Sequence, residues 1–228
     1  MLIGIIGPTT YEITPFINEA NIETIETHAK YTFHIGKYNE LPIVIVMCGV
    51  CKVNAAIATQ ILIDKYAVTN IFVTGVAGAL DKNLEVGDTV IANEFIYHDV
   101  DENILVDYHP FKDDYIFYPD EKMYLLSKIV AKEMKFPIYH GRLVTGETFV
   151  TDKERDIIIK DFQPLCVDME TAAIAHVCEI NNIPFLAIRS MSDSADEDSH
   201  DSFINNVKRA ALNSLKILKS LLNKLKDE

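Results

Sequence analysis

Two acidic residues, Glu170 and Asp193, stand at positions where a bound ligand would meet the ends of buried strands. Glu170 lies at the start of an expected helix, and Asp193 closely follows an expected strand over residues 183–190. In an open α/β sheet, ligands bind outside the carboxyl ends of the strands. Both carboxyl groups can therefore face one cleft, where they could bind a polar ligand or exchange protons with it.

A third acid, Glu12, closely follows the first expected strand, which covers residues 2–6. Its position alone favours a structural role, because Thr9 or Thr10 can cap a helix there. An acid in the first turn of a helix stabilises the helix dipole by roughly 0.3–1 kcal/mol. Without further information, we interpret Glu12 as part of a helix start.

The composition excludes several classes of partner. The chain has 228 residues, 49% of them hydrophobic, and a formal net charge of −13. It is long enough to bury a sizeable core, and its acidity disfavours nucleic acid and anionic membrane surfaces as partners. No apolar run approaches the roughly 18 residues that span a bilayer, and the start of the chain lacks the basic region of a signal peptide. We therefore expect a cytoplasmic protein that binds neither nucleic acid nor membrane.

Three motifs could suggest a cofactor or a metal, and each departs from the required pattern. Cys48-x-x-Cys51 straddles a strand end rather than opening a helix, and no second pair or histidine cluster accompanies it. Gly4-x-x-Gly7 lacks the spacing of a dinucleotide-binding loop. The acidic run over residues 192–201 lacks the spacing and the glycine of a calcium loop. We expect reduced cysteines, no metal and no cofactor.

Strands alternate with helices along the chain, which predicts one mixed-sheet α/β domain over residues 1–228 with helices on both faces. Further strands are expected over residues 22–25, 31–38, 41–47, 71–74, 86–92 and 139–145. Helices are expected over residues 52–66, 123–134, 151–160 and 203–226. The small residues 75–80 at a strand exit either let the backbone approach a ligand closely or permit a tight turn. The aromatic stretch 102–120 predicts a long loop that acts as a lid or an interface arm.

Two of these helices show an apolar stripe at helical spacing, which predicts the face that packs on the sheet. In the first, the stripe consists of Val53, Ala56, Ile57, Ile61 and Leu62. In the last, it consists of Val207, Ala211, Leu212, Leu215, Leu218 and Leu221.

Eight separated segments together resemble one family. They are Gly4-Ile-Ile-Gly7 with Glu12, Gly49-Val50-x-Lys52-Val53, Thr74-Gly-x-Ala-Gly78, Val86-Gly87-Asp88, Tyr97-His98-Asp99, Gly146-x-x-Phe149, Val167-Asp-Met-Glu170 with Ala172-x-x-Ala-His176-Val177, and Ile188-Arg-x-x-Ser-Asp193. In this order they resemble the bacterial 5′-methylthioadenosine/S-adenosylhomocysteine nucleosidases of the nucleoside phosphorylase-like superfamily. The resemblance covers nearly the whole chain and is weakest over residues 102–160.

The resemblance implies hydrolysis of an adenine N-glycosidic bond, which gives adenine and a 5′-thioribose. Such a cleavage passes through an oxocarbenium-like sugar, so it needs an acid for the leaving group and help for an attacking water. By the resemblance, Asp193 is the acid at purine N7, and Glu12 is the carboxylate that deprotonates the water. Arg189 matches an arginine that helps to hold that water. Glu12 is thus reassigned from a structural role to a catalytic one.

The resemblance also implies the contacts with a nucleoside substrate. Glu170 matches the ligand of the ribose hydroxyls, and Met169 lines the sugar. Phe149 would stack on the purine, and the backbone of Val150 would read the adenine edge. The remaining pocket residues expected are Asp168, Ser192, Val76, Val50 and Phe203.

The resemblance further implies a homodimer, in which the loop around residues 105–111 closes the neighbour's pocket. Three residues depart from the family pattern, since Val76 replaces a serine, Thr9 a methionine and Cys51 a glycine. These departures leave open the preference for a particular nucleoside and the hydrogen bonding of Asp193.

Three alternatives remain. A related hydrolase would act on futalosine-type or other 5′-substituted nucleosides. A purine nucleoside phosphorylase is disfavoured, because Glu12 stands where a phosphate dianion would bind and would repel it. A non-catalytic nucleoside-binding protein on the same fold is disfavoured by the presence of Glu12, Glu170 and Asp193 together.

Overall fold

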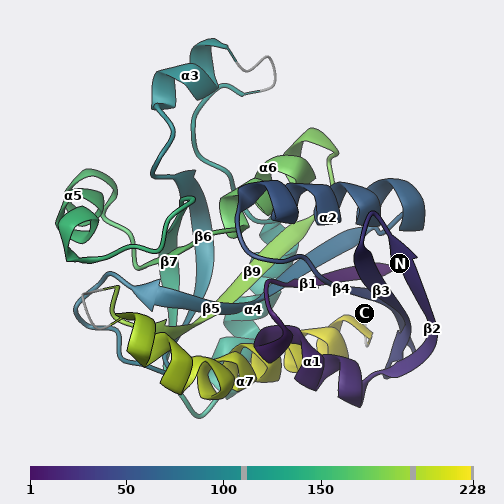
Figure 1. Ribbon diagram of the computed structural model, residues 1–228. Coiled ribbons are helices and arrows are strands. Elements are labelled where there is room, and N and C mark those ends of the chain that lie inside the picture. Colours follow the sequence, from purple (N-terminus) through teal and green to yellow (C-terminus); the bar gives the residue numbers. More distant parts are fainter. Residues whose placement is uncertain (109–111, 196–198, 227–228) are drawn as a thin grey trace.

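A mixed sheet of nine strands forms the centre of the computed structural model, which describes residues 1–108, 112–195 and 199–226 (Figure 1). The strands are β1 (Ile3–Gly7), β2 (Asn21–His28), β3 (Tyr31–Tyr38), β4 (Leu41–Met47), β5 (Asn70–Ala79), β6 (Thr89–Tyr97), β7 (Ile138–Thr145), β8 (Cys166–Asp168) and β9 (Phe185–Asp193). The helices are α1 (Thr10–Glu19), α2 (Lys52–Tyr66), α3 (Glu102–Asp107), α4 (Glu121–Glu133), α5 (Asp152–Phe162), α6 (Thr171–Ile180) and α7 (Ser199–Lys226).

The strand order is β2-β3-β4-β1-β5-β8-β7-β6-β9, and β5 also pairs with β9. The strands β5, β8, β7, β6 and β9 therefore close into a ring, whereas β2, β3, β4 and β1 extend from it as an open sheet. β1, β5 and β9 run parallel, so their carboxyl ends meet at one edge. Every residue of β1 and of β9 is buried, as expected for parallel strands that are covered on both faces.

Helices cover both faces of the sheet, which confirms the predicted fold class. Figure 1 shows α2 and α6 on one side and α1, α4 and α7 on the other. One core cluster joins Ala55 of α2 to Ile174 of α6. A second joins Phe16 of α1 to Leu218 of α7. The sheet is thus held between two apolar layers.

Local signals fixed several elements where they were expected. The Thr9–Glu12 and Thr151–Glu154 capping boxes begin α1 and α5. The Asn39-Glu40 pair joins β3 to β4, and both residues have positive φ, as in the turns that suit the twist of a hairpin. In each case, side-chain chemistry within a few residues determines the backbone.

Three expectations about individual elements were wrong. β5 continues to Ala79 instead of ending at Thr74, because the small residues keep their pairing with β9. In α2, Val53 and Ile57 are 67% and 42% exposed, because the helix buries the side of Ala55 and Ala58, and Leu62 of the expected stripe is buried with them. In α7, Leu212 is exposed although its neighbours in the expected stripe are buried.

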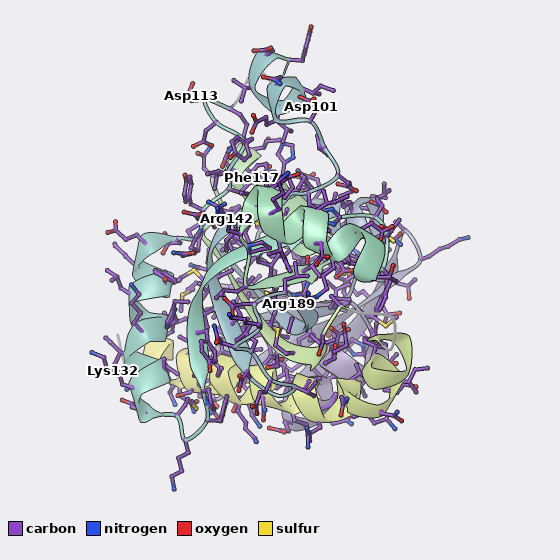
Figure 2. All side chains as sticks on the ribbon, turned by 90° about the vertical axis from the view of Figure 1, so that its left-hand side faces the viewer. Asp101, Asp113, Phe117, Lys132, Arg142 and Arg189 are labelled. Atoms are coloured by element: carbon purple, nitrogen blue, oxygen red, sulfur yellow. The ribbon has the colours of Figure 1, made fainter. Side chains whose placement is uncertain are left out.

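The stretch expected to be a loop over residues 102–120 contains a short helix, α3. Asp101 caps it by accepting a hydrogen bond from Asn103 N at 2.8 Å. Figure 1 shows α3 standing away from the body of the molecule, and Figure 2 shows Asp101 and Asp113 on this arm and Phe117 near its base. Phe117 is buried and bridges to Phe95 of β6. Residues 109–111 of the expected interface loop lie outside the described part.

The described residues contain neither a candidate membrane span nor a candidate metal cluster. None of their helices is long and apolar enough to cross a membrane. Within the same residues, no group of three or more histidine, cysteine, aspartate or glutamate side chains is arranged to hold a metal ion.

Candidate active site

A cleft of about 250 Å³ opens at the edge where β1, β5 and β9 end. Every residue predicted for the site lines it except Arg189. The predicted residues in its lining are Glu12, Val50, Val76, Phe149, Val150, Asp168, Met169, Glu170, Ser192, Asp193 and Phe203. The structure therefore brings together side chains from across the chain, and it places Arg189 behind the wall of the cleft.

Glu12 makes a helix-capping contact and also lines the cleft. Its Oε2 accepts hydrogen bonds from Thr9 N at 2.9 Å and from Thr9 Oγ1 at 2.6 Å, which is the helix-capping role. Its Oε1 accepts a hydrogen bond from Val76 N of β5 at 2.8 Å. Burial raises the pKa of Glu12, although the Arg189 charge acts to lower it. A carboxylate with a raised pKa is suited to accept a proton near neutral pH.

Gly75 is the residue that allows Glu12 and Arg189 to approach each other. A Cβ atom at position 75 would collide with Glu12 Oε1 and with Arg189 Nη1. The glycine is required here by close approach rather than by a turn, because it lies inside β5.

Arg189, which Figure 2 labels, is fully buried and lies among three carboxylates. Its Nη2 lies 2.7 Å from Asp168 Oδ2 and 3.4 Å from Glu170 Oε2, and its Nη1 lies 3.7 Å from Glu12 Oε1. Among the described residues, Nη1 has no hydrogen-bond partner. A buried donor without a partner is rare and points to a function for the adjacent space.

Asp168 organises the floor of the cleft. Its carboxylate accepts hydrogen bonds from the hydroxyl groups of Thr145 and Thr171, at 2.6 Å for Thr145, and it pairs with Arg189. It also accepts from Glu170 N at 3.3 Å and from Thr171 N, at the start of α6. These contacts hold Arg189 and the start of α6 in place.

Glu170 is the N-cap residue of α6 and is buried in the cleft wall. Its Oε1 accepts a hydrogen bond from Cys51 N at 3.0 Å. Burial, together with the nearby Asp168, raises the pKa of Glu170 from 4.5 to about 8, against the influence of Arg189. In the folded protein, Glu170 therefore holds a proton far more tightly than in the unfolded chain.

This raised pKa predicts how a substitution of Glu170 changes stability. The stabilising proton on Glu170 is fully present below pH 4.5 and is lost as pH rises toward 8, because the folded state then carries a buried charge. Glu170→Gln removes this loss, so its free energy of unfolding relative to the parent should increase by about 2 kcal/mol or more between pH 5 and pH 8. Chemical denaturation at several pH values measures this difference. Parallel curves would contradict the prediction, and Glu121→Gln on the surface serves as control.

Cys51, which precedes α2, adopts a backbone conformation that suits glycine. Its φ is 81° and its ψ is 159°, a region that other residues rarely occupy. The strain is placed where the Cys51 N–H meets Glu170. The cysteine thus keeps a backbone geometry that serves the cleft at a cost in stability.

Cys51→Gly should accordingly raise the free energy of unfolding by roughly 1–3 kcal/mol, because glycine adopts this φ without strain. Urea denaturation of the two proteins measures the change. Val53→Gly is the matched control, since it places glycine in the first turn of the same helix and should lower stability by about 0.5–1 kcal/mol. A Cys51→Gly protein no more stable than the parent would show that the strain is absorbed elsewhere.

Asp193 ends β9 and faces the cleft. Its Oδ2 accepts a hydrogen bond from Ser192 Oγ at 2.8 Å, and its Oδ1 accepts one from Ala195 N at 3.0 Å. Both donors lie within two residues of Asp193 in the sequence, so the end of β9 itself helps to hold the carboxyl group. The backbone of β5 passes close by, because a Cβ at Gly78 would lie 2.8 Å from Asp193 Oδ1.

The apolar part of the cleft comes from two aromatic rings and the residues beside them. The rings of Phe149 and Phe203 lie 6.2 Å apart at an interplanar angle of 81°. Phe149 is 40% exposed, whereas Val150 and Val76 are buried. Val50 is 40% exposed at the rim. A flat apolar ligand could therefore enter beside Phe149.

Sequence reasoning missed two kinds of site residue. The first consists of small lining residues, namely Ala77, Gly78 and Ala195. The run of small residues in β5 pointed to the first two, but a tight turn explained it equally well. The second kind is the supporting hydroxyls of Thr145 and Thr171, which lie next to expected site residues and had no distinct pattern of their own.

Comparison with known protein families decides the class of this site. Residues 2–223 match the phosphorylase superfamily. The chain belongs to the phosphorylase superfamily. Among relatives, it is 35% identical to a 5′-methylthioadenosine/S-adenosylhomocysteine nucleosidase of Exiguobacterium, over 99% of each chain. It is also 32% identical to an aminodeoxyfutalosine nucleosidase of Helicobacter pylori, over 98% of each.

Solved structures of superfamily members agree with this assignment. A Neisseria meningitidis 5′-methylthioadenosine/S-adenosylhomocysteine nucleosidase in complex with methylthio-immucillin-A has a TM-score of 0.92, with 31% identity over 98% of this chain and 99% of that one. The futalosine hydrolase of Helicobacter pylori has a TM-score of 0.91, with 29% identity over 98% of each. These relatives are N-ribosyl hydrolases, and they support nucleoside hydrolysis as the activity of this superfamily member.

Proposed function

We propose that the chain, as one nucleosidase domain over residues 1–228, hydrolyses 5′-methylthioadenosine and S-adenosylhomocysteine to adenine and the corresponding 5′-thioribose. The observation that carries the proposal is that Glu12 and Asp193, the two acids that the reaction needs, line one cleft together with Glu170. A water that enters this cleft can reach the Glu12 carboxyl group. Glu12 then orients the water and takes its proton, which makes the water oxygen a nucleophile.

Asp193 supplies the acid in this proposal. The bond between C1′ and N9 breaks, and its electron pair goes to the purine, which Asp193 protonates at N7. The water oxygen bonds to C1′, and its proton goes to Glu12. Glu12 lies in the first turn of α1 and Asp193 at the end of β9, and both line the cleft, which supports this division of roles.

The walls of the cleft fit the two halves of a nucleoside. Phe149 would stack on the purine, and the Val150 backbone would meet the adenine edge. Glu170 would bind the ribose hydroxyl groups, and Met169 would line the sugar. All four line one cleft of about 250 Å³, which supports this placement.

Water is favoured over phosphate as the nucleophile. A phosphate dianion beside Arg189 would also meet the side chains of Glu12 and Asp168, which lie within 4 Å of the guanidinium. The Asp168 carboxylate already pairs with this cation, and a carboxylate at Glu12 would repel a further anion. Phosphorolysis is therefore disfavoured on electrostatic grounds.

A second candidate substrate is aminodeoxyfutalosine. It is favoured by the relatives of this name in Helicobacter pylori, which match the chain nearly as closely as the methylthioadenosine nucleosidases do. The catalytic acids would act in the same way on either nucleoside, because both substrates differ at the 5′ position rather than at the glycosidic bond.

The deciding experiment measures adenine release from 5′-methylthioadenosine in phosphate-free buffer and again after phosphate is added. We expect adenine in both buffers and no sugar-1-phosphate. Strict dependence on phosphate would overturn the assignment of water as nucleophile. Comparison of kcat/KM for 5′-methylthioadenosine, S-adenosylhomocysteine and aminodeoxyfutalosine then identifies the preferred substrate. Absence of cleavage of all three would overturn the proposed function.

We infer that the working form is a homodimer. The outer face of α2 exposes Val53 and Ile57, and the projecting α3 exposes Ile104 and Tyr108, at 56% and 81%. Groups of exposed apolar side chains are typical of protein interfaces. Leu105, expected at the start of the interface loop, is instead buried. A monomer with full activity in sedimentation at micromolar concentration would contradict the inference.

A further inference from the structure

Lys52, Asp99 and Glu147 form an ion-paired cluster, called the clasp below, where three segments meet beside the cleft. Lys52 is the first residue of α2, Asp99 follows β6, and Glu147 follows β7. Lys52 Nζ lies 2.8 Å from Asp99 Oδ1 and 2.9 Å from Oδ2. Glu147 N donates to Asp99 Oδ2 at 2.9 Å, and Lys52 N donates to Glu147 Oε1 at 3.0 Å. Each of the three residues therefore contacts the other two.

The clasp is better shielded than an ordinary surface ion pair. The side chains of Lys52 and Asp99 are 19% and 29% exposed, against 37% and 41% for Lys65 and Glu26. Burial acts to raise the pKa of Asp99, but the hydrogen bonds from Lys52 and from Glu147 N outweigh it and lower that pKa. Partial shielding with several hydrogen bonds makes such a cluster stronger than an isolated exposed pair.

One side of the clasp holds the wall expected to meet the purine. Glu147 lies in the loop whose next residues, Thr148, Phe149 and Val150, line the cleft. The start of this loop is packed tightly, because the His98 ring leaves no room for a Cβ at Gly146. Asp99 then fixes the loop one residue further on, through Glu147 N.

The other side of the clasp holds the carboxylate expected to bind the ribose. Cys51 N donates to Glu170 Oε1 at 3.0 Å, and the next amide, Lys52 N, donates to Glu147 Oε1. Two consecutive N–H groups at the start of α2 therefore bind two different carboxyl groups, those of Glu170 and Glu147. The positive end of the helix dipole favours both contacts.

We propose that Lys52 and Asp99 are positioning residues that fix the spacing between the purine-binding loop and Glu170. The roles of these two walls rest on the proposed function. A nucleoside contacts both walls at once, and its glycosidic bond lies between them. An error in their spacing therefore displaces this bond from Glu12 and Asp193, although neither Lys52 nor Asp99 touches the substrate.

The test compares Asp99→Ala, Lys52→Met and the double variant with the parent. Each single change should lower kcat/KM by about 10–100-fold, because small misplacements of a reacting bond have effects of this size. The double variant should lose no more than about threefold beyond the worse single one, since both changes break the same cluster. Glu94→Ala is the matched control. This change breaks a 2.6 Å ion pair between Glu94 of β6 and Arg142 of β7, whose side chains are 30% and 27% exposed. The kcat/KM of Glu94→Ala should stay within about twofold of the parent value.

Hydrogen exchange gives a readout that does not need activity. Asp99→Ala should speed amide exchange in residues 146–150 and 50–53 together, whereas Glu94→Ala should leave both segments unchanged. Parent-like kcat/KM in a folded Asp99→Ala protein would overturn the proposal. So would single losses that multiply in the double variant, or losses that follow the unfolding temperature in every variant, the control included. If the parent cleaves no nucleoside, the proposed function fails. The clasp is tested separately: it would be overturned if Asp99→Ala changed the amide exchange of only one of the two segments.

Discussion

Asp193→Asn should lower kcat for nucleoside cleavage by about 10²–10⁴-fold while substrate binding is kept. An amide cannot give a proton to purine N7, so the leaving group would depart as an anion. The variant should still fold, because the Asn oxygen can accept one of the two hydrogen bonds from Ser192 Oγ and Ala195 N. Steady-state kinetics gives kcat, and calorimetric titration with 5′-methylthioadenosine gives the affinity.

Asp88→Asn is a suitable control for this experiment. Asp88 is also buried, and it accepts a backbone hydrogen bond from Glu85 N at 3.0 Å, in a turn that does not line the cleft. Its replacement should change stability but leave kcat within about threefold. Equal losses in the two variants, or a parent-like kcat in Asp193→Asn, would remove Asp193 from the reaction.

Glu12→Gln should lower kcat by a comparable factor, about 10²–10⁴-fold, because an amide cannot take a proton from water. It should also destabilise the protein by about 1–3 kcal/mol. The reason is that Glu12 accepts hydrogen bonds on both oxygens, from Thr9 and from Val76, and the Gln amide nitrogen would face one of these donors. Kinetics below the unfolding temperature separates the two effects.

The second capping box provides the control for the structural part. Thr151 and Glu154 repeat at α5 the arrangement of Thr9 and Glu12 at α1, and Glu154 does not line the cleft. Glu154→Gln should disturb its helix start in the same way and leave kcat unchanged. If Glu12→Gln behaves like Glu154→Gln, the carboxylate serves only the helix.

The sequence predicted those parts of the fold in which short-range chemistry decides the backbone. The capping residues Thr9 and Thr151 and the Asn39-Glu40 hairpin are of this kind. The ring closed by β5 and β9 was missed, because pairing between distant strands leaves no local pattern. The role of Gly75 stayed open between a tight turn and a close approach for the same reason, since its small size reflects a contact with Glu12 and Arg189 from other elements.

The site was predicted mainly through the family resemblance. Position alone gave Glu170 and Asp193 but favoured a structural role for Glu12, and the structure shows that the capping contact and the cleft contact coexist. Arg189 was placed against the water, yet it lies outside the cleft lining. The spacing of residues along a chain cannot show which charged groups form a second layer, because that depends on burial. The same holds for the exposed Val53 and Ile57, whose pattern is that of a core face.

The strand β5 also bears on the stereochemistry of the product, because it contacts both of the proposed acids. Its backbone contacts Glu12 through Val76 N and approaches Asp193 at Gly78. The two contact points are two residues apart, which is roughly 7 Å along a strand, so β5 holds the two acids at separate places. A water that one acid activates attacks C1′ from the face opposite the purine that the other acid protonates, and such a single displacement inverts the anomeric carbon. A β-nucleoside should therefore yield the α-anomer of the sugar first, which early-time proton NMR would detect before the anomers equilibrate. If the β-anomer appears first, the two acids do not work from opposite faces of the ring.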